Sequence, residues 1–159
     1  MSPDAYIPVH VTADTYGRIT VPKHLSDCIP WLRGTENPQA WILLIAAGRY
    51  RLLSDEEVQS DPQLEAVRSL VLEGKSAAVT EPTFAEESRR AAIVATLVQA
   101  TIAPFKPGWR ISFPKGFNVF RPPECDPNAF SILLSLEGYL EVWYTDVLRK
   151  AALPLEGQQ

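Results

Sequence analysis

The chain has 159 residues, a formal net charge of −4 and 46% hydrophobic residues, which predicts a globular protein of one domain or of two small intertwined halves. This charge excludes a protein that coats nucleic acid with its whole surface. The best candidate for a membrane span, Trp41 to Ala47, is far too short. Because the only cysteines are Cys28 and Cys125 and the N-terminus has no signal-peptide pattern, we expect a reduced, cytoplasmic protein.

The first part of the chain reads as two strands followed by a short helix. Tyr6 to Ala13 alternates like a strand, with its aliphatic residues on one face. Asp14 to Gly17 has the composition of a hairpin loop, so Arg18 to Val21 is predicted to be the returning strand. Pro22 to Ile29 is expected to form one or two helical turns, because proline is tolerated at a helix start.

A second hairpin and two helices are predicted next. Ala40 to Ala47 and Arg49 to Leu53 form the hairpin, with Gly48 at the reversal. Asp61-Pro62 begins a helix that Gly74 ends. Thr83 to Glu86 matches a capping box, and the absence of glycine and proline from there to about Ile102 predicts one more helix, with Ile93, Leu97 and Ala100 on one face.

Three strands are predicted in the last third of the chain. The first is Trp109 to Phe113, which Pro114 stops. Phe130 to Leu136 and Tyr139 to Tyr144 are the other two, joined by a turn at Glu137-Gly138.

One short motif occurs twice. Arg18-Ile-Thr-Val-Pro-Lys23 returns as Arg110-Ile-Ser-Phe-Pro-Lys115, at a spacing of 110 − 18 = 92 residues. The turn glycines Gly48 and Gly138 repeat at nearly the same spacing, 138 − 48 = 90 residues. Two landmarks in the same order indicate a duplication. A half of this size has too few strands to bury its own core, so the halves should interlock into one barrel.

The segment Asp14 to Lys23 resembles the signature of the AbrB/SpoVT swapped-hairpin family: Asp, two variable residues, Gly, Arg, an apolar-x-apolar stretch, then Pro. Two such units joined by helices are similar to the MraZ family of transcriptional regulators. The segment Pro82-Thr83-Phe84 with Glu87 and Arg89-Arg90 looks like the MraZ connector, and Phe130 to Asp146 resembles its closing hairpin.

This resemblance implies an α+β, mainly β fold, a double-split β-barrel of two interleaved AbrB/SpoVT-like repeats with connecting helices. It divides the chain into a first repeat (1–58), a helical connector (59–102), a degenerate second repeat (103–150) and a flexible tail (151–159). It also implies a homo-oligomeric ring that is nucleoid-associated, binds double-stranded DNA upstream of its own division or cell-wall operon, and has no enzymatic activity. In the second repeat, Lys106 stands where the motif wants Asp, and Trp109 where it wants Gly.

The candidate DNA-binding residues are basic side chains in acid-free stretches, namely Arg18, Lys23, Lys106, Arg110 and Lys115. Such side chains bind phosphates, and arginine also reads guanine. Asp14 and Gly17 are expected to organise the first turn. For Arg18, pairing with Asp14 to lock the hairpin stays an equal alternative.

No cofactor or metal site is predicted, because the chain lacks a phosphate-binding glycine loop and enough cysteine and histidine ligands. His24 and Cys28 are four residues apart, but no third residue completes a catalytic set. The alternative function is a protein-interaction or antitoxin-like module of the same fold that does not bind DNA.

Overall fold

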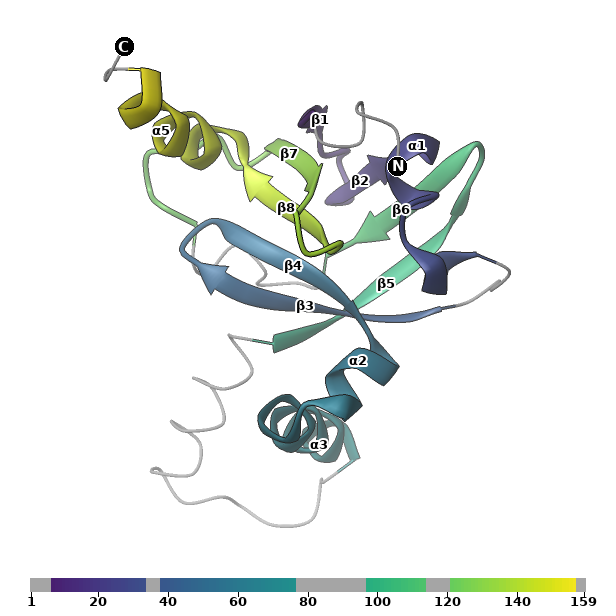
Figure 1. Ribbon diagram of the computed structural model, residues 1–159. Coiled ribbons are helices and arrows are strands. Elements are labelled where there is room, and N and C mark those ends of the chain that lie inside the picture. The colour runs from purple at the N-terminus through teal and green to yellow at the C-terminus, as the bar shows by residue number, and fades with distance from the viewer. Residues whose placement is uncertain (1–6, 34–37, 77–96, 114–120, 157–159) are drawn as a thin grey trace.

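The computed structural model describes residues 7–33, 38–76, 97–113 and 121–156 (Figure 1). The strands in these ranges are β1 (Val9–Thr12), β2 (Arg18–Val21), β3 (Gln39–Ala46), β4 (Arg49–Ser54), β5 (Leu97–Phe105), β6 (Gly108–Ser112), β7 (Ala129–Leu134) and β8 (Leu140–Tyr144). The helices are α1 (Lys23–Ser26), the 3-10 turn η2 (Pro30–Leu32), α2 (Asp55–Ser60), α3 (Pro62–Ser76) and α5 (Thr145–Glu156).

The strands form one antiparallel sheet in the order β1-β7-β8-β4-β3-β5-β6-β2, which curls into a nearly closed barrel. Four of its pairings, β1 with β7, β2 with β6, β3 with β5 and β4 with β8, join the first half of the chain to the second. Within each half only the hairpins β3–β4, β5–β6 and β7–β8 are paired, so the complete sheet needs both halves. The predicted mainly β class is confirmed.

Two strand pairings have the register expected if a two-fold axis relates the two halves of the chain. On such an axis, a residue of one half pairs with the residue at the equivalent position of the other half. Ile19 pairs with Ile111, 111 − 19 = 92 residues later, and Arg51 pairs with Glu141, 141 − 51 = 90 residues later. These are the spacings of the repeated motif and of the turn glycines.

Two apolar clusters hold the sheet. The larger fills the barrel with inward side chains such as Ile19, Ile111 and Ile132, all at most 1% exposed. The smaller lies outside the barrel, where α2 and α3 cover one part of the sheet (Figure 1). It includes Trp41 from β3 and Leu97 from β5. Successive side chains of a strand point to opposite faces of the sheet, so strands such as β3 and β5 contribute residues to both clusters.

The predicted pairing of the first two strands is wrong. The turn between them exists, since the Gly17 amide donates to the Asp14 carbonyl at 3.0 Å. β1 and β2, however, pair with β7 and β6 and lie at the two ends of the sheet order. A local turn signal does not determine which strand supplies the ladder of hydrogen bonds.

The predicted helix up to Ile102 is also wrong over its last part, because residues 97–105 form β5. Its start at Thr83 lies outside the described residues. Leu97 and Ala100 fit a helical spacing, but Val98, Ala100 and Ile102 fit a strand spacing equally well and face the barrel core. Pairing with β3 and β6 decides for the strand.

Other boundaries differ less from expectation. The tail predicted to be flexible from residue 151 belongs in part to α5, which runs to Glu156, and α3 continues through Gly74 to Ser76. The hairpins that turn at Gly48 and Gly138 are confirmed, with φ of +79° and +90°. Both cysteines are free thiols. Among the described residues, no helix has the length and apolarity to cross a membrane.

Candidate nucleic-acid interface

Strands β2 and β6 lie side by side, and their outer face brings together the two arginines of the repeated motif (Figure 1). The central pair Ile19–Ile111 points inward and is buried. Strand alternation therefore turns Arg18 and Arg110 to the outside. We call the outer surface formed by Arg18, Thr20, Arg110 and Ser112 the β2–β6 face.

The two arginines are diagonal neighbours on this face. Arg18 stands opposite Ser112, and Arg110 stands opposite Thr20. Diagonal neighbours in an antiparallel pair have β-carbons about 7–8 Å apart. Two like charges and two hydroxyl groups thus share a small area, and only the tertiary pairing of the two halves creates it.

Asp14 holds the first turn together from one end. Its Oδ1 accepts hydrogen bonds from the backbone amides of Tyr16 and Arg18, both at 2.9 Å, and its Oδ2 accepts from Arg18 Nε at 2.7 Å. The backbone hydrogen bond from Arg18, opposed by desolvation, lowers the pKa of Asp14. Gly17 has φ of +73°, a conformation that favours glycine. Arg18 is consequently oriented by its own turn.

Each arginine of the face also lies against an aromatic ring. Arg18 Cζ is 4.9 Å from the centroid of Tyr16, and Arg110 Cζ is 3.7 Å from the centroid of Phe105. Arg110 has no acidic ion-pair partner among the described residues. A guanidinium that lies on a ring keeps its in-plane N–H groups available to acceptors.

The second turn differs from the first in its length. Phe105 pairs with Gly108, so Lys106 and Pro107 form a two-residue connection at the tip of the β5–β6 hairpin. In this hairpin Arg110 stands opposite Ala103, so its ladder partner is not acidic, and Lys106 lies in the connection.

Gly108 is the point where this hairpin contacts β2. A β-carbon at Gly108 would lie 2.0 Å from the carbonyl oxygen of Val21 and 3.2 Å from the amide nitrogen of Lys23. Only glycine permits this approach, which sets the start of α1 against the second turn. The local signal for this contact is Gly108 itself, which directly follows Pro107.

The remaining candidates are less well placed or lie outside the described residues. Lys23 begins α1 and forms an ion pair with Asp27 at 2.7 Å, with its side chain 64% exposed. Lys115 falls in a range that the structure does not describe. Cys28 Sγ contacts the backbone oxygen of His24 at 3.4 Å, so the contact does not involve the imidazole.

A buried charge cluster on the outer side of β4 and β8 was not predicted. Glu141 is 1% exposed and accepts hydrogen bonds from Arg49 Nε at 2.9 Å, Arg51 Nη2 at 3.0 Å and Trp143 Nε1 at 3.1 Å. Burial alone would raise the pKa of Glu141, but the hydrogen bonds from Arg49 and Arg51 outweigh it and lower that pKa. The register of β4 against β8 brings these residues together from distant parts of the sequence, so no short sequence pattern predicts the cluster.

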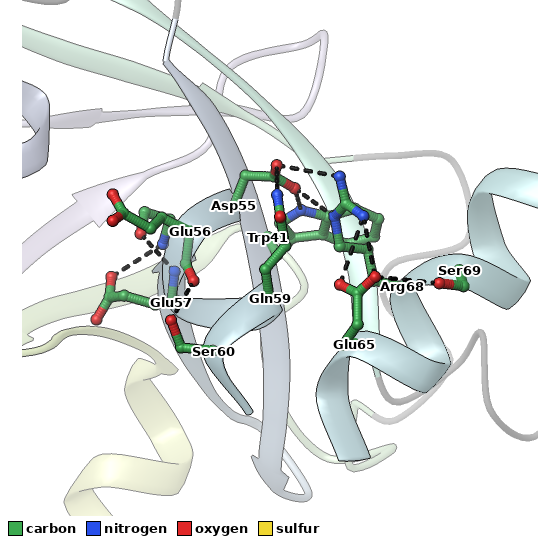
Figure 2. Close-up of polar contacts among 10 residues, drawn as sticks. Trp41, Asp55, Glu56, Glu57, Gln59, Ser60, Glu65, Arg68 and Ser69 are labelled. Atoms are coloured by element: carbon green, nitrogen blue, oxygen red, sulfur yellow. Dashed lines mark hydrogen bonds and ion pairs between the residues drawn. The ribbon is translucent and has the colours of Figure 1, made fainter. Parts of the chain in front are cut away.

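A second polar cluster joins the helices to the sheet. Figure 2 shows Trp41 and Arg68 converging on Asp55, with Trp41 Nε1 at 2.8 Å and Arg68 Nε at 2.7 Å from its Oδ1. The hydrogen bond from Arg68 is the main reason that the pKa of Asp55 is lowered, with desolvation acting against it. Nearby, Ser54 and Glu57 form a capping box at the start of α2. These contacts fix α2 and α3 on β3.

A cleft of about 280 Å³ lies between these helices and the sheet, and its lining includes Arg51, Glu57, Asp61 and Tyr139. Glu57 and Asp61 already accept backbone hydrogen bonds as helix caps. In the part of the chain that the structure describes, no three potential metal ligands lie together. The β2–β6 face is therefore taken as the candidate site, because its Arg110 has no acidic partner among the described residues.

The chain matches no protein-family model, and no curated protein resembles it at a significant level.

Proposed function

We propose that the chain is a DNA-binding transcriptional regulator of the MraZ type, a double-split β-barrel that acts on repeats upstream of its own operon. The observation that carries the proposal is the pair Arg18 and Arg110 on the outer face of β2 and β6. These arginines come from the two copies of one motif and meet beside the two-fold pair Ile19–Ile111. The cross-half strand pairings support the interleaved fold.

β2 is the last strand in the sheet order and β6 is its neighbour, so the outward arginines lie near an edge of the sheet that would enter a DNA groove. The major groove admits a two-stranded β-ribbon, and arginine binds the O6 and N7 of guanine with two hydrogen bonds. Lys106, at the tip of the β5–β6 hairpin, adds positive charge beside the face and would contact a phosphate, as would Lys23 on leaving its partner Asp27. Asp14 would orient Arg18 and would not itself touch DNA, because a carboxylate repels phosphate.

The small size of the face favours an oligomer as the active form. One face offers only a few cationic groups, and each neutralised phosphate adds modest, salt-dependent affinity. Several copies in a ring would engage successive repeats together, and linked weak contacts gain strongly by multivalency. We therefore propose a homo-oligomeric ring, cytoplasmic and nucleoid-associated, that acts without enzymatic chemistry.

Fluorescence anisotropy with the duplex upstream of the protein's own operon tests the proposal. We expect binding that weakens steeply with salt. The double variant Arg18→Ala, Arg110→Ala should lower the slope of log K against log salt by about 0.9 for each phosphate that the variant no longer neutralises.

The matched control is Arg149→Ala, Lys150→Ala, which removes the same charge from exposed side chains of α5, 70% and 61% exposed. It should bind like the unchanged protein. Absence of binding at low salt, or equal weakening in both double variants, would contradict the proposal.

One observation favours the alternative, a protein-interaction module of the same fold. Two of the basic candidates, Arg18 and Lys23, already form ion pairs with Asp14 and Asp27 at 2.7 Å. If their role is to lock the turn and α1, the protein should bind no duplex and should co-purify with a protein partner free of nucleic acid.

A further inference from the structure

Two exposed aromatic rings flank the arginines of the β2–β6 face. Tyr16 is 78% exposed and Phe105 is 42% exposed, and neither belongs to either apolar cluster. Most large apolar side chains of the described chain are at least partly buried, so these rings contribute little to the core. Unlike the exposed Leu136, both rings lie against an arginine of the face.

The rings and the arginines form one line across the face. Tyr16 lies on Arg18, Arg18 is the diagonal neighbour of Arg110, and Arg110 lies on Phe105. We call these four residues the aromatic–arginine strip. Phe105 belongs to the outward side of β5, two residues beyond Ala103, the residue opposite Arg110. Both ends of the strip are therefore rings on the solvent side of the sheet.

This arrangement has the chemistry of a surface that contacts bases as well as phosphates. Aromatic side chains stack on bases, which all have a π-face, and apolar side chains wedged between base steps partly unstack the duplex. A guanidinium beside each ring supplies the positive charge that brings the DNA backbone close.

We propose that Tyr16 and Phe105 insert against the bases of the bound DNA and unstack a base step at each end of the strip. This inference rests on the DNA binding proposed above, and it adds that the protein deforms its DNA. Because each ring lies on an arginine, insertion of the ring brings that arginine to the adjacent phosphates. Contact of the strip with the DNA backbone and unstacking of a DNA base step would therefore occur together.

The test compares a perfect duplex with the same duplex carrying a central mismatch, which lowers the cost of unstacking. We expect the unchanged protein to bind the mismatched duplex more tightly. The double variant Tyr16→Ala, Phe105→Ala should lose that preference and bind the perfect duplex about fivefold or more weakly, with an unchanged salt slope. A 2-aminopurine at the binding site should brighten with the unchanged protein and stay quenched with the variant.

Two further variants sharpen the result. Tyr16→Phe keeps the ring and should bind like the unchanged protein, and Leu136→Ala removes a 92% exposed apolar side chain at the β7–β8 turn and should have no effect. Binding within twofold by the double aromatic variant, together with abolished binding in Arg18→Ala, Arg110→Ala, would overturn this inference and leave the proposed function standing. Failure of the unchanged protein to bind any duplex would overturn both.

Discussion

The strand pairs β2–β6 and β4–β8 are the two places where equivalent parts of the two halves meet, and the sheet uses them in opposite ways. At β2–β6 the outward charges are both positive, Arg18 and Arg110, and they lie in partial contact with solvent. At β4–β8 the axial pair is Arg51 and Glu141, and the carboxylate is 1% exposed. At the first crossing Arg18 pairs with Asp14 at the surface, whereas at the second crossing two arginines share one buried carboxylate.

The two crossings also differ in where the charges lie in the ladder. Arg18 and Arg110 are diagonal neighbours on either side of the axial pair Ile19–Ile111, so their repulsion is weak. Arg51 and Glu141 stand directly opposite each other, and removal of the carboxylate would leave the arginines without their shared partner. Substitutions at the two crossings test these differences, beginning with the largest expected effect.

Removal of the buried carboxylate should destabilise the protein most. In Glu141→Ala, Arg49 and Arg51 lose their shared partner while their side chains stay mostly buried, at 33% and 19% exposed, so we expect a loss of about 3 kcal/mol in the free energy of unfolding by urea. The control is Glu137→Ala, because Glu137 also pairs with Arg51, at 3.3 Å, but its side chain is 68% exposed. That variant should lose about 1 kcal/mol or less. Equal losses of stability in the two variants would show that burial does not determine how much the Glu141 ion pairs contribute.

A methyl group at the contact between the second hairpin and β2 should have the next largest effect. In Gly108→Ala the β-carbon meets the Val21 carbonyl oxygen at 2.0 Å, so the backbone must shift. We expect a loss of about 1–3 kcal/mol, measured by urea unfolding.

The comparison for Gly108 is Gly17→Asn in the first turn. A β-carbon at Gly17 meets nothing within 4 Å, and asparagine tolerates a φ of +73°. That substitution should cost about 1 kcal/mol or less. A neutral Gly108→Ala would mean that the two strands need not approach so closely.

Acid should weaken the β4–β8 crossing selectively. Because the folded-state pKa of Glu141 is lowered from its ordinary value of 4.5, its contribution is fully present above pH 4.5 and is lost as the pH falls through the lowered pKa. The measurement is the unfolding free energy of the unchanged protein minus that of Glu141→Gln, between pH 6 and pH 3. This difference should shrink on acidification, and Asp14 and Asp55, which titrate in both proteins, should cancel from it. A difference that stays constant over this range would contradict the lowered pKa.

The smallest effect on stability is expected at the β2–β6 face. The side chains of Arg18 and Arg49 are equally exposed, at 32% and 33%. Arg18→Ala breaks only a surface ion pair with Asp14 and should cost about 1 kcal/mol or less in thermal unfolding. Arg49→Ala leaves Glu141 short of two hydrogen bonds and should cost about 1–3 kcal/mol. If both variants unfold alike, the contrast between the two crossings fails.

Local sequence patterns predict seven of the eight described strands, all but β5, and the turns at Gly48 and Gly138. Strand alternation, the glycines at positions 48 and 138 and the repeated motif predicted a mainly β protein, the hairpin loops and the spacings of 92 and 90 residues. These features depend on local chemistry. Glycine reaches positive φ without strain, and one face of each strand must be apolar to be buried.

Which strands pair, and which charged side chains become neighbours, depend on the tertiary structure. Leu97 to Ile102 suits a helix or a strand locally, and pairing with β3 and β6 selects the strand. Glu141 and Arg51 are 90 residues apart, and Arg18 and Arg110 are 92 apart, so register alone brings each pair together. These contacts form, and contribute free energy, only in the folded sheet, because no short segment of the chain contains both partners.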